Sequence, residues 1–215
     1  MNEVLDMKPA LAERERHSDF LRSLVDFTKE HRAARWTGTL AAFLEGVFPT
    51  DPKGITRTSH QYLWDMMRAE GRLFGDELYG IDETIARVQD YFKAAASGSE
   101  VGRRLLLLLG PPSGGKSSMV ILLKRGLEAY SASDAGALYA IHGCPVHESP
   151  LHLVPHTLRP QFRQTYAVEI SGELCPYCAH RVQQEFGGDF LQMPVERIFV
   201  SEAGRTGVGT YAPHD

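Results

Sequence analysis

The hydrophobic positions of the first 72 residues recur with the spacing of amphipathic helices. Three stretches show this pattern, at about 20–27, 40–47 and 59–71. A run rich in helix-breaking residues, from Pro49 to Gly54, separates the second stretch from the third. We therefore expect a helical N-terminal region over residues 1–72, with three helices that pack through their apolar faces.

From about residue 73 the pattern changes to helices that alternate with short apolar runs. One helix is expected from its cap at Asp82 to just before Gly98, and another over residues 117–130. Three apolar runs have the length of β-strands, at 105–109, 137–141 and 195–200. Such alternation favours an α/β fold built around a parallel sheet. We expect residues 73–215 to form this core, with a Cys- and His-containing insertion at about 142–180.

The composition is that of an ordinary globular protein without a strongly charged surface. Of the 215 residues, 43% are hydrophobic and 23% are charged, and the net charge is −4. We therefore expect neither nucleic acid nor an anionic membrane as a partner, and no apolar run approaches the length of a membrane span. The acidic N-terminus lacks the residue order of a signal peptide. Three cysteines, an odd number, do not indicate a disulfide framework, so a reducing cytoplasm is the predicted location.

The run from Gly110 to Ser117 fits the phosphate-loop pattern G-x-x-x-x-G-K-[ST]. Its glycines let successive backbone N–H groups curl around phosphates, and the helix that follows directs its positive end at the anion. Lys116 is expected to reach the β- and γ-phosphates as the catalytic cation, and the Ser117 hydroxyl to bind Mg²⁺. The residues predicted to contact the nucleotide are Gly110, Pro111, Pro112, Ser113, Gly114, Gly115, Lys116, Ser117 and Ser118.

The alternative is a glycine turn between a strand and a helix that binds no ligand. An apolar run before the loop and an amphipathic helix after it favour the nucleotide site. The guanine-specific Asn-Lys-x-Asp element is excluded because Asn2 is the only asparagine, so ATP is preferred by elimination. Hydrolysis also needs an acidic residue that ends an apolar strand. After the loop the candidate is Glu202, for which a surface role is the alternative reading, so the sequence supports binding better than turnover.

Two short segments share the form Cys-Pro-x-Cys or Cys-Pro-x-His. Two ligands at i and i+3 on a tight turn can face one cation, and two such turns complete a tetrahedron. The sequence therefore predicts a structural Zn²⁺ bound by Cys144, His147, Cys175 and Cys178. The fourth ligand stays open, because His142 and His152 lie nearby. Two other readings remain: a glutaredoxin-like redox pair at Cys175-Pro-Tyr-Cys178, and thiols that bind no metal. Residues 148–174 look poor in regular structure, so a cross-link there would stabilise much.

Several segments together resemble the PrkA-type bacterial serine protein kinases. They are Leu78-Tyr79-Gly80-Ile81-Asp82-Glu83, Tyr91-Phe92-Lys93-Ala94-Ala95-Ala96, the phosphate loop, Pro150-Leu151-His152-Leu153 with Pro155, and Glu185-Phe186-Gly187-Gly188. The resemblance covers essentially the whole chain. It implies an AAA+ ATPase module of P-loop NTPase fold, with ATP and Mg²⁺ as cofactors, a homo-oligomer as in other AAA+ proteins, and a role in bacterial stress or starvation responses. It also implies that Tyr79, Gly80 and Ile81 lie near the base.

The departure from the family is one of length. The chain stops before the family's second acidic motif, its sensor residues and its C-terminal region, so we expect a truncated member. It contains no His-Arg-Asp, Asp-Phe-Gly or kinase glycine loop. Serine kinase activity on a protein substrate is thus implied by the resemblance alone. Two other functions stay open: a non-catalytic ATP- and zinc-dependent interaction module, and an unrelated P-loop kinase acting on small molecules.

Overall fold

The computed structural model describes residues 17–26, 35–71, 74, 77–111 and 114–208. Two compact units are distinguished, Met1–Trp36 and Thr37–Asp215. In the first unit, residues 17–26 form a helix, as its apolar stripe predicts. Phe20, Leu21 and Leu24 on that stripe are 60%, 47% and 44% exposed, and the packing of this face against other helices stays a prediction. The remaining member of the stripe, Phe27, lies outside the described residues.

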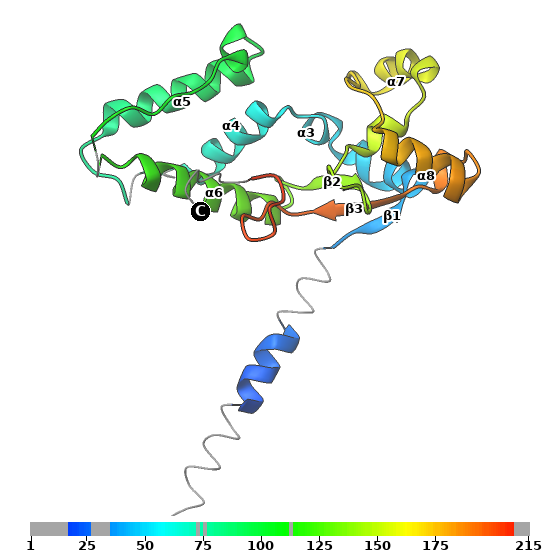
Figure 1. Ribbon diagram of the computed structural model, residues 1–215, viewed down its shortest axis with the longest axis horizontal. Helices are drawn as coiled ribbons and strands as arrows, with labels where there is room; N and C mark the ends of the chain where they lie inside the picture. Colours follow the sequence, from blue (N-terminus) through cyan, green and yellow to red (C-terminus); the bar gives the residue numbers. More distant parts are fainter. Residues whose placement is uncertain (1–16, 27–34, 72–73, 75–76, 112–113, 209–215) are drawn as a thin grey trace, which may run out of the picture. The chain divides into compact units, whose positions relative to one another are not determined.

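The sheet of the second unit has three strands, β1 (Thr37–Thr39), β2 (Leu138–Ile141) and β3 (Pro194–Ile198), in the order β1-β3-β2 (Figure 1). The predicted strands at 137–141 and 195–200 are thus confirmed. Both neighbouring pairs are antiparallel, so the prediction of a parallel sheet is wrong for the described strands. The insertion leaves β2 and returns to β3 at the same place, where the His142 N–H donates to the Pro194 carbonyl at 2.9 Å. Strands joined in this way must run in opposite directions.

The predicted strand at 105–109 is not present. This segment has no regular structure, and Leu105, Leu107 and Leu109 are 88%, 65% and 82% exposed. An apolar strand is stable only when neighbouring strands pair with it and other residues cover its faces. No described strand lies beside these leucines. The segment has the apolar composition of a strand, but no strand in the described part of the chain pairs with it.

A helical segment follows β1 and packs against the insertion between β2 and β3. It runs through α2 (Leu40–Ala42), a π-helical turn η1 (Phe43–Val47), a 3-10 turn η2 (Phe48–Thr50) and α3 (Pro52–Ile55). The helix predicted at 40–47 is therefore confirmed, although part of it is wound as a π-helix. Phe43 and Phe48 are fully buried, and Phe48 packs on Phe162 and Tyr166 with ring centroids 5.2 and 5.0 Å apart.

Three longer helices form the other apolar core of this unit: α4 (Ser59–Glu70), α5 (Asp82–Ala96) and α6 (Lys116–Ala132). A short 3-10 turn, η3 (Glu100–Arg103), follows α5. Met66 of α4, Val88 of α5 and Met119 of α6 meet in one buried cluster. Helix α4 thus shares its apolar core with α6, which follows the phosphate loop. The boundary that the sequence suggests near residue 72 stays a prediction. Asp82 is the first residue of α5 and not its cap, which is Ile81.

The insertion between β2 and β3 is more regular than its prolines suggest. It contains the 3-10 turns η4 (Pro150–Leu153) and η5 (His156–Leu158), and then α7 (Arg159–Tyr166). The second cysteine segment opens α8 (Pro176–Phe186), and η6 (Phe190–Gln192) leads back to the sheet. Across the whole described part of the chain, no helix has both the length and the apolar character that a bilayer crossing requires.

Candidate nucleotide site and cysteine cluster

The phosphate loop leads directly into α6, as the sequence predicts. Gly115, with φ of +77°, is the residue that caps the helix, and Lys116 is its first helical residue. A left-handed φ at this position suits glycine and strains residues with a Cβ atom. The Lys116 Nζ donates to the carbonyl oxygens of Gly110 and Pro111, at 2.9 and 2.5 Å. The ammonium therefore lies inside the loop, at the N-terminal end of a 17-residue helix whose dipole favours an anion there.

Other predicted contacts of the nucleotide lie on the same turn or outside the described residues. Ser117 and Ser118 follow Lys116 in the first turn of α6 and are exposed, so their hydroxyls are accessible to a ligand. Pro112 and Ser113 belong to the part of the chain that is not described. The amide of Gly114 donates to the Pro111 carbonyl at 3.2 Å, which closes a tight turn within the loop.

The segment before α5 lies against the loop. A Cβ atom added to Gly115 would come within 3.1 Å of Ile81 Cδ1 and 3.5 Å of Leu78 Cδ2. Gly80 has φ of +73°. The Tyr79 side chain, between Leu78 and Gly80 in sequence, is 81% exposed. The structure thus brings the Leu78 and Ile81 side chains next to Gly115 of the phosphate loop. Contact of Tyr79, Gly80 or Ile81 with the base stays a prediction.

Glu202 is not brought to the loop. Its carboxylate forms an ion pair with Lys124 on α6, and its backbone N–H donates to Glu128 Oε1 at 2.7 Å. Lys124 comes eight residues after Lys116, which corresponds to about 12 Å along a helix. Glu202 therefore lies beside the middle of α6, and this ion pair gives it a structural role. Its role as the acid of the metal site stays a prediction.

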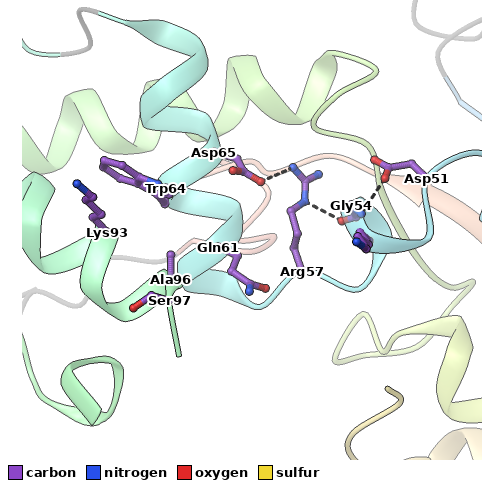
Figure 2. A pocket seen from close by; sticks show the side chains of 10 residues that line it. Asp51, Gly54, Arg57, Gln61, Trp64, Asp65, Lys93, Ala96 and Ser97 are labelled. Carbon is purple, nitrogen blue, oxygen red and sulfur yellow. Dashed lines mark hydrogen bonds and ion pairs between the residues drawn. The ribbon is translucent and has the colours of Figure 1, made fainter. Parts of the chain in front are cut away.

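A cleft of about 580 Å³ lies between α3, α4 and α5 (Figure 2). Its walls include Trp64, Lys93 and Arg57, and none of the described loop residues lines it. The Arg57 guanidinium does not face a ligand, because it donates to the Gly54 carbonyl at 2.7 Å and to Asp65 Oδ2 at 3.0 Å. These contacts hold the helices together, and the nucleotide site at the phosphate loop stays a prediction.

The three cysteines meet in one place, although two of them lie far from the first in sequence. Cys144 follows β2, Cys175 caps α8, and Cys178 lies in the first turn of that helix. The Cys144 and Cys175 sulfurs are 3.9 Å apart, and all three cysteines are free. One ligand atom from each of Cys144, Glu148, Cys175 and Cys178 lies within 4.8 Å of the others.

The sequence pattern predicts His147 as the fourth ligand and gives no signal for its neighbour Glu148. The His147 side chain is exposed and does not belong to this group, and its backbone has φ of +48°. His142 pairs with Glu196 at 3.0 Å, and His152 pairs with Glu148 at 3.0 Å. A search for Cys or His at i+3 cannot find Glu148, because it lies at i+4 from Cys144 and carboxylates are common in every sequence.

Backbone amides and neighbouring thiols set the ionisation of the cluster. Burial disfavours the Cys144 thiolate, but hydrogen bonds from the backbone N–H groups of Glu148 and Val146 and from the other thiols bring the pKa of Cys144 below its usual range. Burial raises the pKa of Cys175 and, more strongly, that of Cys178. The thiolate form is thus favoured more at Cys144 than at Cys175 or Cys178. Because a metal binds cysteine as the thiolate, a cation that binds here displaces protons.

The loop and α6 define the class of protein. A glycine loop that ends in Gly-Lys-Ser at a helix N-terminus is the phosphate-binding device of P-loop nucleotide-binding proteins. Residues 52–215 match the family described as the PrkA AAA domain, and the chain belongs to this family. The resemblance drawn from the sequence is therefore confirmed, and with it an AAA-type ATP-binding module that uses ATP and Mg²⁺.

Two curated relatives illustrate the extent of the match. The chain is 42% identical over 208 residues to the ATP-dependent protease PrkA of Bacillus subtilis (strain 168), which covers 92% of this chain and 33% of that protein. It is 26% identical over 98 residues to an uncharacterized protein in the gldA 5' region of Geobacillus stearothermophilus, covering 40% of this chain and 99% of that protein. The chain thus spans about a third of the length of its Bacillus subtilis relative. No solved structure matches it significantly.

Proposed function

We propose that this chain is the ATP-binding AAA+ module of a PrkA-type protein and that residues 110–117 hold the phosphates of MgATP. The observation that carries the proposal is the position of Lys116. Its ammonium lies within the loop, held by the carbonyls of Gly110 and Pro111, at the positive end of α6. A phosphate that enters the loop accepts the same protons, because a charged oxygen is a stronger acceptor than a carbonyl. The Ser117 hydroxyl would bind the Mg²⁺ that accompanies ATP.

The test is the substitution Lys116→Ala, with Lys93→Ala as its matched control. Lys93 lines the cleft of Figure 2 and is exposed, so this pair also compares the two candidate sites. We expect K116A to lose about a hundredfold or more in affinity for a fluorescent ATP analogue, equivalent to a few kcal/mol of binding. K93A should bind like the parent chain. Equal affinity in K116A and the parent chain would refute the proposal that the loop binds the phosphates. A loss of affinity confined to K93A would indicate that the nucleotide binds in the cleft instead.

We further propose that ATP is coupled to a reaction on a protein, within a homo-oligomer of the AAA+ kind. The resemblance implies phosphorylation of serine, whereas the name of the Bacillus subtilis relative describes ATP-dependent proteolysis. Incubation with casein and γ-labelled ATP separates these activities: labelled casein supports the kinase, and ATP-dependent release of peptides supports the protease. The role in stress or starvation responses and the cytoplasmic location stay predictions from the sequence.

A further inference from the structure

The cysteine cluster has the dimensions of a zinc site. Four ligands at tetrahedral corners with Zn–S bonds of about 2.3 Å place the sulfurs about 3.8 Å apart. The Cys144 and Cys175 sulfurs are 3.9 Å apart. A disulfide needs a separation of about 2.05 Å, so the observed spacing suits a shared cation and not a bond between the thiols. Cys144 and Cys178 are 3% and 0% exposed, which protects such a site from solvent.

The carboxylate of Glu148 completes this arrangement. Its side chain is 5% exposed, and Oε1 accepts from the Cys175 N–H at 2.8 Å and lies 3.0 Å from His152 Nδ1. Among the described residues, none forms a hydrogen bond with the buried Oε2. A buried carboxylate oxygen without a partner is destabilising unless a cation lies beside it. This carboxylate belongs to the same four-residue group as the three sulfurs.

His152 orients the carboxylate and is not itself a ligand. Its Nδ1 faces Glu148 Oε1, and its Nε2 lies 2.9 Å from the Ser171 carbonyl. Both ring nitrogens thus lie within hydrogen-bond distance of oxygen atoms, and His152 is not among the residues whose ligand atoms converge. A partner of this kind commonly fixes the orientation of a metal ligand.

We propose that Cys144, Cys175, Cys178 and Glu148 bind one Zn²⁺ as a closed, structural site. Three thiolates and a carboxylate around Zn²⁺ leave a charge of −2, which backbone N–H donors at the cluster partly offset. The N–H of Cys178 donates to Cys175 Sγ at 3.4 Å, at the positive end of the 11-residue helix α8. The Arg181 guanidinium donates to the His142 carbonyl at 2.6 Å, but its charge is paired with Glu185 at 3.1 Å, so the backbone N–H groups remain the main compensation.

The metal would join the end of β2 to the start of α8. It would close the loop of residues 145–174, which contains η4, η5 and α7. With four protein ligands the site has no open position for a substrate, so the ion stabilises the insertion and takes no part in catalysis. The site shares no residue with the phosphate loop, and the proposal is independent of the proposed function.

The test compares two adjacent residues, Glu148→Gln and His147→Ala. The parent chain, purified without chelator, should contain about one zinc per chain by elemental analysis. Replacement by Co²⁺ should give the absorption bands of tetrahedral thiolate ligation. We expect E148Q to lose on the order of a hundredfold or more in zinc affinity and to change the cobalt spectrum, while H147A retains both. C178S should lose the metal, and circular dichroism of E148Q shows whether the chain is still folded.

Each other outcome counts against the proposal. A parent chain free of metal that does not take up Zn²⁺ or Co²⁺ refutes the site. Loss of zinc in H147A with retention in E148Q would refute Glu148 as the fourth ligand and indicate His147, the ligand expected from the sequence. A stable disulfide between Cys175 and Cys178, with reversible reduction, would assign the cluster to redox chemistry.

Discussion

Arg57 offers the sharpest test of what holds the second unit together. It lies between α3 and α4 and is 12% exposed. Its guanidinium donates to four groups: the Gly54 carbonyl, Asp65 Oδ2, the Tyr130 hydroxyl at 2.8 Å and the Ala135 carbonyl at 2.8 Å. Figure 2 shows the first two of these contacts at the wall of the cleft. One side chain thus joins the start of α4 to the end of α6 and to the segment before β2.

The substitution Arg57→Ala removes all four hydrogen bonds. A hydrogen bond to a charged group contributes about 1.5–3 kcal/mol when measured alone. The effects are not additive, and partners such as Asp65, which is 35% exposed, regain hydrogen bonds to water. We therefore expect a loss of about 3 kcal/mol in the free energy of unfolding. For a chain of this size, that corresponds to a fall of roughly 6–12 °C in Tm.

The assay is urea unfolding followed by circular dichroism, with Arg87→Ala as the matched control. Arg87 also forms an ion pair, with Glu83, but its side chain is 77% exposed. Exposed pairs of this kind contribute little, so R87A should stay within about 0.5 kcal/mol of the parent chain. Arg57→Lys keeps the charge but loses the fork of donors, and should fall between the two. Equal stability of R57A and R87A would refute the role assigned to Arg57.

Two further substitutions test the loop and the helical core. Gly115→Ala should destabilise the chain by about 1–2 kcal/mol and weaken binding of an ATP analogue, because φ is +77° and the new Cβ would lie 3.1 Å from Ile81 Cδ1. The control is Gly46→Ala, whose new Cβ meets nothing within 4 Å. Equal effects of the two substitutions would contradict this account. Burial raises the pKa of Tyr62, so the stability it contributes is present below about pH 10 and is lost at higher pH, as the unfolded phenol ionises first. Tyr62→Phe should therefore cost about 1 kcal/mol at pH 7, through the lost hydrogen bond to the Gly136 carbonyl, and should unfold at a higher pH than the parent chain; a parent-like alkaline midpoint in urea titrations would argue against it.

The elements that the sequence predicted well are those with local signals at both ends. Helix α4 begins with the capping box of Thr58 and Gln61 and ends at Gly71, which has φ of +59°. The phosphate loop is likewise a motif of consecutive residues, and it leads into α6 at the expected point. In these cases the physics that fixes the structure acts over three or four residues, so one sequence is enough.

The features that were missed depend on contacts between distant residues. An apolar run such as 105–109 has the composition of a strand, but composition carries no information on whether a partner strand lies beside it. Strand direction follows from where a connection returns, which the run itself does not encode. In the cysteine cluster, the turns at Cys144 and Cys175 were found from their spacing. Glu148 joined them only through the packing of the insertion.

The leucines before the phosphate loop have a consequence for handling the chain. Their exposure alternates: Leu105, Leu107 and Leu109 are open to solvent, while Leu106 and Leu108 are partly covered. A short, uncharged, apolar segment that is exposed and not paired in a sheet is a template on which other chains form intermolecular β-structure. The whole chain has a net charge of −4, which gives only modest electrostatic repulsion between molecules in solution. The usable concentration in solution is therefore expected to be set by association through this segment, before global unfolding becomes limiting.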